Sequence, residues 1–385
     1  MMLHREKKRG KLRAFFGDTD MVLWGLCFCA SVFGCILVFS ATVGAGGGKS
    51  GYLVQFIASA VGLCVAFFMS RVDYHDICKL WFVWLGLAVF LVLLTFTPLG
   101  LNVSGTDDTA WLGFPLSSPR ITFQPSEFLK IAFILSFATH LDKVKETLNR
   151  PLTLLMLCLH GGFACGLIFL QGDDGTALVF AFIFAAMLFA AGLHLGYFAA
   201  AFGAIAVAVP ILWSHMDEQK KARFLSLIQV EEYAKTEGWQ QAHGLSAIGS
   251  GRLWGLGLLK GENVDLFARN NDFIFTVAGE EMGFIGGTVL LLLLFLIILR
   301  VLYAARTAED YTGMLICSGM AALLAAQSLI NLGMVLRVLP VVGITLPFFS
   351  AGGSSVATLY LGMGLVMSVY CQSRMRSGGL FSKKR

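Results

Sequence analysis

Charged residues are scarce in this chain. Asp, Glu, Lys and Arg make up 14% of its 385 residues, whereas 57% are hydrophobic. A soluble domain carries about 25% charged residues. The shortage of charge therefore excludes an ordinary soluble domain and predicts an integral membrane protein.

Other features are missing too. The alternating ten-residue pattern of a membrane β-barrel is absent, so strands are not expected. The nine cysteines are scattered without metal-ligand spacing, which argues against disulfides and a zinc site. The first apolar run is not followed by a small-residue cleavage site, so a cleavable signal is not expected. The glycine-rich stretch 44–50 has Val43 where a phosphate-binding loop needs Gly, which argues against nucleotide binding.

What the sequence does contain is a series of apolar runs, each near the length that crosses a bilayer. They lie near residues 21–43, 52–70, 79–99, 127–141, 152–170, 175–194, 196–215, 273–302, 312–336 and 345–371. The sequence predicts an all-α polytopic membrane protein with about ten transmembrane helices in a single domain, 21–371. A large loop, 216–272, separates the seventh and eighth helices.

Lys and Arg indicate the orientation of this bundle. They gather in 1–20, 71–79, 143–150, 300–306 and 374–385. Because positive charge stays on the cytoplasmic side, the basic arm 1–20 and the basic tail 372–385 are both predicted to be cytoplasmic. Arms of this kind usually set topology, so nucleic-acid binding is not expected. The loop 216–272 and the segment 337–355 then face outward, where a catalytic site is expected.

Asp272 is the most informative residue. It ends the long loop, one step before the apolar run that begins at Phe273. Charge at membrane depth is costly and tends to be functional. Glu280 and Glu281 follow inside the run and are predicted to belong to an interior polar network, whereas Asp272, at the aqueous end, can meet a substrate hydroxyl.

Two further segments carry charge near span ends. Glu127 and Lys130 are three residues apart, so they can pair on one helix face; alternatively, Lys130 binds an anionic head group. Asp173 and Asp174 lie in a short polar stretch between two runs. A tight turn explains them as well as a cation site does.

Glycine and proline mark the remaining segments. Around Gln240 and Ser250, glycines alternate with aromatic residues, which is typical either of a half-inserted amphipathic segment or of a structural re-entrant turn. Pro340 and Pro347 interrupt the apolar stretch 337–355. Broken backbone at membrane depth is tolerated inside protein or around a cavity, so this segment is predicted to form a cavity wall.

These segments, in this order, resemble the SEDS family of shape, elongation, division and sporulation proteins, which includes RodA-like, FtsW-like and SpoVE-like members. The resemblance covers about residues 100–356 and rests on the motifs 123–130, 171–176, 240–251, 272–283 and 339–355. It implies a peptidoglycan glycosyltransferase that polymerises lipid II at the outer face of the bacterial cytoplasmic membrane. It also implies a class B penicillin-binding protein as partner.

The family's essential carboxylate falls on Asp272, which is expected to be the general base. Direct attack with a carboxylate base predicts inversion at the anomeric carbon. Asp173 is a candidate ligand for a divalent cation, Mg²⁺ or Mn²⁺, and an organic cofactor is not expected. The candidate substrate-binding residues are Trp111, Glu127, Lys130, Gln171, Arg223, Gln240, Ser250, Arg337, Ser354 and Ser355. The candidate structural residues are Glu280, Glu281, Pro340, Pro347, Gly352 and Gly353.

The chain departs from the family pattern at several of these points. Asn270 and Asn271 stand where a His-Thr pair is usual, and His243 replaces a Gln. Arg337 stands where Gly is common. Of a basic stretch in the family, Trp111 alone carries over.

Two functions from other classes compete with this interpretation. A flippase for lipid-linked precursors would use Asp272 as a cation or proton site. A non-catalytic scaffold of the cell-wall machinery would retain its activity in cells without the carboxylate. The sequence has no motif that selects among elongation, division and spore formation.

Overall fold

The computed structural model describes residues 19–44, 46, 50–102, 109–113, 122–233, 235–262, 266 and 268–382, with side chains to 375. Most of the basic arm, the end of the basic tail and the stretch that precedes β3 lie outside the described residues.

Ten main helices follow the predicted apolar runs within the described part of the chain. They are α2 (Met21–Gly44), α3 (Ser50–Met69), α5 (Trp81–Leu94), α6 (Pro125–Val144), α7 (Pro151–Leu170), α8 (Asp174–Ala190), α9 (Leu195–His215), α13 (Ile274–Thr307), α14 (Tyr311–Val335) and α15 (Gly353–Ser382). Seven of these described helices are long and apolar enough to cross a membrane: α2, α3, α7, α9, α13, α14 and α15. The helices α5 and α8 are shorter, and α6 carries four charged residues.

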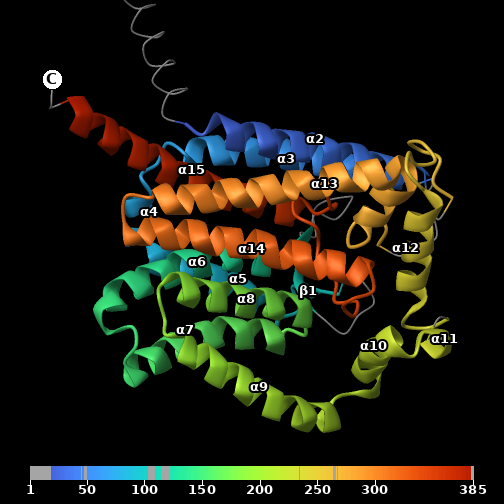
Figure 1. Cartoon of the computed structure of the whole chain (residues 1–385), viewed down its shortest axis with the longest axis horizontal. Helices are drawn as coiled ribbons and strands as arrows, with labels where there is room; N and C mark the ends of the chain where they lie inside the picture. Colours follow the sequence, from blue (N-terminus) through green and yellow to red (C-terminus); the bar gives the residue numbers. More distant parts are fainter. Residues whose placement is uncertain are drawn as a thin grey trace, which may run out of the picture.

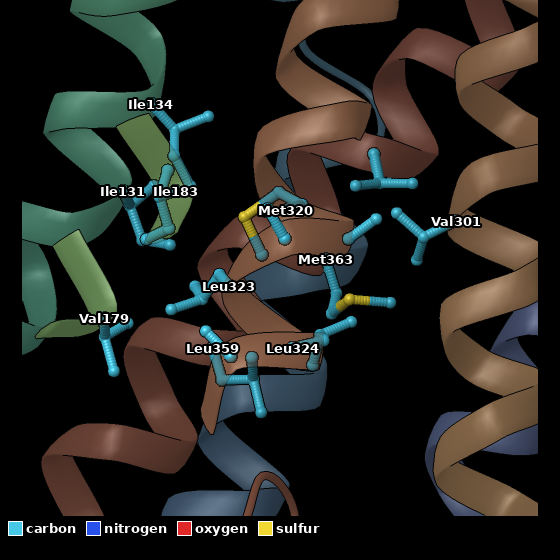
Figure 2. Close-up of a cluster of buried hydrophobic side chains, with 14 of the residues drawn as sticks. Ile131, Ile134, Val179, Ile183, Val301, Met320, Leu323, Leu324, Leu359 and Met363 are labelled. Atoms are coloured by element: carbon cyan, nitrogen blue, oxygen red, sulfur yellow. The ribbon is translucent and has the colours of Figure 1, made fainter. Parts of the chain in front are cut away.

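The helices lie side by side in one bundle with α14 near its centre (Figure 1). α14 packs against α13, α8 and α6, while α15 packs along α3. Figure 2 shows buried side chains of these helices in one apolar cluster, among them Ile131 of α6, Ile183 of α8, Met320 of α14 and Met363 of α15. α9 stands at the edge of the bundle, and all of its residues are at least partly exposed.

The irregular segments gather at one end of the bundle (Figure 1). One of them is a small antiparallel sheet of β1 (Gly100–Leu101), β2 (Trp111–Gly113) and β3 (Thr122–Phe123), with Gly100 opposite Leu112 and Leu112 opposite Phe123. The expectation of no strands was wrong here. A ladder this short has no alternating pattern long enough to detect. The opposite end holds the short helix α4 (Tyr74–Lys79).

The long loop 216–272 includes three helices in its described part. It contains α10 (Glu218–Ile228), α11 (Val230–Tyr233) and α12 (Trp239–Ser250), and α12 packs on α13 and α14. The segment 336–352 has no helix, so α15 begins later than the apolar run that predicted it.

α13 is interrupted at Gly283, whose backbone is non-helical with φ of 67°. The stretch 252–257 crosses α13 at this point. The amides of Leu256 and Gly257 donate to the carbonyls of Glu280 and Glu281, at 3.0 and 2.9 Å. In return, Phe284 N donates to the Arg252 carbonyl at 2.8 Å. The loop therefore supplies the hydrogen bonds that the broken helix lacks.

Candidate active site

Asp272 lies in the turn that leads into α13, at the irregular end of the bundle. Its side chain is half-buried and faces the non-helical segment: the Cβ position of Gly343 would lie 3.8 Å from Asp272 Oδ2. Gly343 has φ of 70°, a conformation that glycine adopts at little cost. The backbone can therefore pass close to the carboxylate there.

The backbone around Asp272 is fixed by side chains of neighbouring elements. The amide nitrogen of Asn331, on α14, donates to the carbonyls of Asp272 and Ile344, at 2.7 and 2.6 Å. Ser350 Oγ donates to the Asn271 carbonyl at 2.6 Å. One buried Asn thus joins the Asp272 turn to the non-helical segment and holds both in place.

Asp173 is the second carboxylate of the site. It precedes α8 as its N-cap and accepts a hydrogen bond from Thr176 N at 2.8 Å, an arrangement that satisfies a free amide of the first turn. Gln124 Nε2 also donates to Asp173, at 3.2 Å. The two bonds hold Asp173 near Asp272, close enough for its charge to act on that residue.

Burial and, secondarily, the negative charge of Asp173 raise the pKa of Asp272 to about 7. Both effects disfavour the charged form. No described residue donates a hydrogen bond to the Asp272 carboxylate. An acid with this pKa is poised to accept a proton at neutral pH.

Glu127 and Lys130 form a buried ion pair on the first turns of α6, with 2.8 Å between Lys130 Nζ and Glu127 Oε1. The Lys130 side chain is 1% exposed. The ion pair that the three-residue spacing predicted is therefore confirmed. It leaves the Lys130 ammonium facing Glu127 rather than solvent.

The start of α15 is tied to the sheet and to α3. Ser354 Oγ accepts from Gln124 N and donates to the Thr122 carbonyl, both at 3.3 Å. Ser355 Oγ lies 3.3 Å from Thr345 Oγ1, and Gly352 N donates to Gln55 Oε1 at 3.2 Å. The first turn of α15 thus forms part of the same polar end.

Several buried polar atoms at this end have no hydrogen-bond partner among the described residues. They are Gln55 Nε2, Ser126 Oγ, Gln171 Oε1, Asp174 Oδ1 and Asn331 Oδ1. A buried unpaired polar atom costs about 1–3 kcal/mol. These groups are candidates for contacts with a polar ligand.

Other candidate residues serve different contacts. Arg337 Nη2 donates to the Ser226 carbonyl at 2.8 Å, and Ser250 Oγ donates to the Ala247 carbonyl at 2.7 Å. Arg223 is exposed on α10. Gln240 is half-buried on α12, and Trp111 is half-buried in β2.

Two prolines and a glycine mark the non-helical segment. Pro340 and Pro347 lie within it, and Gly353 opens α15 immediately after it. His243 has an exposed side chain that stacks on Trp239.

Glu280 and Glu281 are buried and share one cation. Arg269 Nη2 lies 2.9 Å from Glu280 Oε2 and 3.3 Å from Glu281 Oε1. Glu281 also accepts from Ser40 of α2. This network ties the residues that precede Asp272 to α13 and α2.

Asp173 is the acidic residue that would hold a divalent cation at this site. In the described part of the chain, no group of three or more His, Cys, Asp or Glu residues has the arrangement of a metal site. Mg²⁺ typically binds one or two carboxylates together with substrate phosphates. A site of that kind would need Asp173 from this chain and oxygens from the substrate.

Sequence reasoning misses the residues whose partners are distant in the chain. It selects Gln240, yet the neighbouring Gln241 donates through Nε2 to the carbonyls of Met334 and Leu339, at 2.7 and 2.8 Å. It singles out Asn331, a polar residue inside an apolar run, but not the carbonyls to which Asn331 donates. It gives no role to Arg269.

Known proteins are similar to this chain along most of its length. The FtsW, RodA and SpoVE model, described as "Cell cycle protein", matches residues 20–375. A probable peptidoglycan glycosyltransferase FtsW from Trichlorobacter lovleyi is 30% identical, with 91% of this chain and 93% of the relative covered. The peptidoglycan glycosyltransferase MrdB of Escherichia coli is 31% identical, with 89% and 92% covered. Stage V sporulation protein E of Bacillus subtilis is 31% identical, with 83% and 87% covered.

Solved structures show the same likeness. A chain of a peptidoglycan synthase complex that coordinates polymerization and crosslinking superimposes with a TM-score of 0.79 at 28% identity, covering 92% of this chain and 98% of that one. The rod shape determining protein RodA of Thermus thermophilus gives a TM-score of 0.67 at 27% identity, with 91% and 96% covered.

Proposed function

Because this chain belongs to the FtsW, RodA and SpoVE family of cell cycle proteins, we propose that it is a peptidoglycan glycosyltransferase that polymerises lipid II into glycan strands. The observation that carries the proposal is the Asp272 carboxylate, whose pKa is raised to about 7 within a polar end of a membrane bundle. The relatives named as peptidoglycan glycosyltransferases support it.

The finer topology belongs to the same proposal. All ten main helices span the bilayer, with both termini in the cytoplasm and the loop 216–272 outside. The site then faces the outer leaflet, where a lipid-linked sugar is accessible. The three helices that fall short of a free-standing span, α5, α6 and α8, are shielded by their neighbours on the bundle side.

In the reaction, Asp272 accepts the proton of the incoming sugar hydroxyl. The hydroxyl oxygen attacks the anomeric carbon of the second substrate, and the bond to the pyrophosphate breaks with its electron pair. This single displacement inverts the anomeric configuration. A divalent cation held by Asp173, when bound, supplies positive charge that offsets the leaving pyrophosphate.

The substrate contacts are proposed from the polar side chains at the irregular end of the bundle, among which Gln171 Oε1 is unpaired. Gln171 and the start of α15, with Ser354 and Ser355, lie close to the carboxylates and present polar groups to a sugar or phosphate. Lys130, with its partner Glu127, contributes electrostatically from beneath the site. Trp111, Arg223, Gln240, Ser250 and Arg337 belong to the elements that surround it.

The testing experiment is lipid II polymerisation by the purified full-length chain, with and without a class B penicillin-binding protein, beside Asp272→Asn. Glycan from the wild type, lost by at least about a thousandfold in the variant, is expected for removal of a group that takes part in the chemical step. Equal polymer from both would remove Asp272 from the centre of the reaction. Vesicle flipping of lipid II without polymer would favour a transporter, and neither activity would favour a scaffold.

A further inference from the structure

α10 presents a lysine to the polar end of the bundle. Lys220 Nζ lies 2.5 Å from Asp174 Oδ2. Asp174 directly follows Asp173, the carboxylate that acts on Asp272. Lys220 is distant in sequence, but its ammonium contacts the residue that directly follows Asp173.

The other nearby cations are engaged elsewhere. Lys130 is buried against Glu127, and Arg337 donates to a backbone carbonyl. The Lys220 side chain, by contrast, is 41% exposed, and its ammonium lies 5.7 Å from the centre of the Phe169 ring. Among the described residues, Lys220 is thus a partly exposed cation in direct contact with Asp174, the neighbour of Asp173 in the chain.

The ion pair that Lys220 makes is easily replaced. Both of its side chains are partly exposed, and exposed pairs contribute little stability because water screens them. α10 packs loosely on the bundle, because Ser226 is the one buried residue among its described residues. The preceding helix α9, described over its full length, has no buried residue. A pyrophosphate carries more negative charge than one carboxylate, so it competes well for the ammonium.

Resting on the proposed function, we propose that Lys220 is a substrate-binding residue that leaves Asp174 to bind the pyrophosphate of the lipid-linked substrate. The pair with Asp174 is its arrangement without substrate. Asp174 holds the lysine beside the site and gives it up when the pyrophosphate arrives. Binding then draws α10 over the lipid-linked sugar.

The test is binding of undecaprenyl pyrophosphate, which does not turn over, to the full-length chain in nanodiscs. Lys220→Gln is expected to weaken binding about tenfold, equivalent to about 1.4 kcal/mol. Lys221→Gln is the matched control, because Lys221 pairs with Glu218 on the same helix at 2.8 Å. Its affinity is expected to stay within about twofold of the wild type.

Asp174→Asn separates binding from mere anchoring of α10. Both Lys220→Gln and Asp174→Asn break the ion pair, but only Lys220→Gln removes the ammonium that binds the pyrophosphate. Asp174→Asn is therefore expected to preserve or tighten binding, and an equal loss in both variants would overturn the proposal. Wild-type affinity in Lys220→Gln would also overturn it while the glycosyltransferase assignment stands. Failure of the wild type to bind would instead reject the proposed substrate class.

Discussion

At the scale of single residues, Asp272 must be both deprotonated and strongly basic at neutral pH, and a carboxylate in water cannot be both. A carboxylate with an ordinary pKa near 4 is charged but weakly basic at neutral pH. Partial burial and the nearby Asp173 raise the pKa of Asp272 to about 7, so the deprotonated form is a stronger base and is still populated. The site achieves this with two carboxylates and without a histidine next to Asp272 in the chain.

The pH dependence of polymerisation follows from this arrangement. The rate is expected to rise with pH and to reach half its maximum near pH 7, because only deprotonated Asp272 accepts a proton. In Asp173→Asn the repulsive charge is gone, so the midpoint moves to lower pH even if the maximal rate falls. Initial rates on both sides of neutral pH measure the midpoint. An unchanged midpoint would show that the two carboxylates are not coupled.

Arg269 leads to a prediction about stability. Its side chain is 4% exposed and serves both Glu280 and Glu281. Arg269→Gln leaves two buried carboxylates without their cation, which is expected to cost about 3–5 kcal/mol. Thermal unfolding in one detergent measures the loss, with exposed Lys260→Gln as the control. Equal melting temperatures for the two variants would contradict it.

At the scale of elements, the crossing of the 252–257 stretch over α13 depends on glycine. A Cβ on Gly283 would lie 2.4 Å from Gly255 N, and φ is positive. Gly283→Ala is therefore expected to destabilise the protein by at least about 1–3 kcal/mol. Amide exchange at Leu256 and Gly257 should speed up with it, since these amides bond across the break.

Gly162→Ala, in α7, is the matched control for that experiment. Nothing lies within 4 Å of its Cβ position, so the extra methyl group meets open space. Alanine in a helix interior gains about 0.5–1 kcal/mol over glycine. The prediction fails if both substitutions shift the melting temperature in the same direction.

Prediction from sequence succeeded where the relevant contact is local. The apolar runs located the helices, and the three-residue spacing of Glu127 and Lys130 predicted their ion pair. It failed where the partner is distant. The bond from Asn331 to Ile344, the shared cation Arg269 and the break at Gly283 all require the folded arrangement of segments, which no spacing encodes.

At the scale of the whole molecule, the structure places the irregular segments at one end and α4 at the other (Figure 1). The proposed orientation puts the irregular end outside. In a cysteine-free background, Glu232→Cys on α11 is expected to react with a membrane-impermeant maleimide in intact spheroplasts. Glu146→Cys, exposed beyond the other end of α6, is expected to react only after permeabilisation. The reverse pattern would invert the topology.

The break in α13 has a mechanical consequence. The helix has 34 residues, which at about 1.5 Å each would exceed the hydrocarbon thickness of about 30 Å. The piece before the break, 274–282, is buried almost throughout in protein, whereas the piece after it exposes Phe284, Leu292 and Phe295. A spanning helix that is longer than the bilayer is thick accommodates the mismatch by tilting. In the proposed orientation we expect the tilt to be taken up after Gly283, so that the Asp272 carboxylate keeps its position in membranes of different thickness.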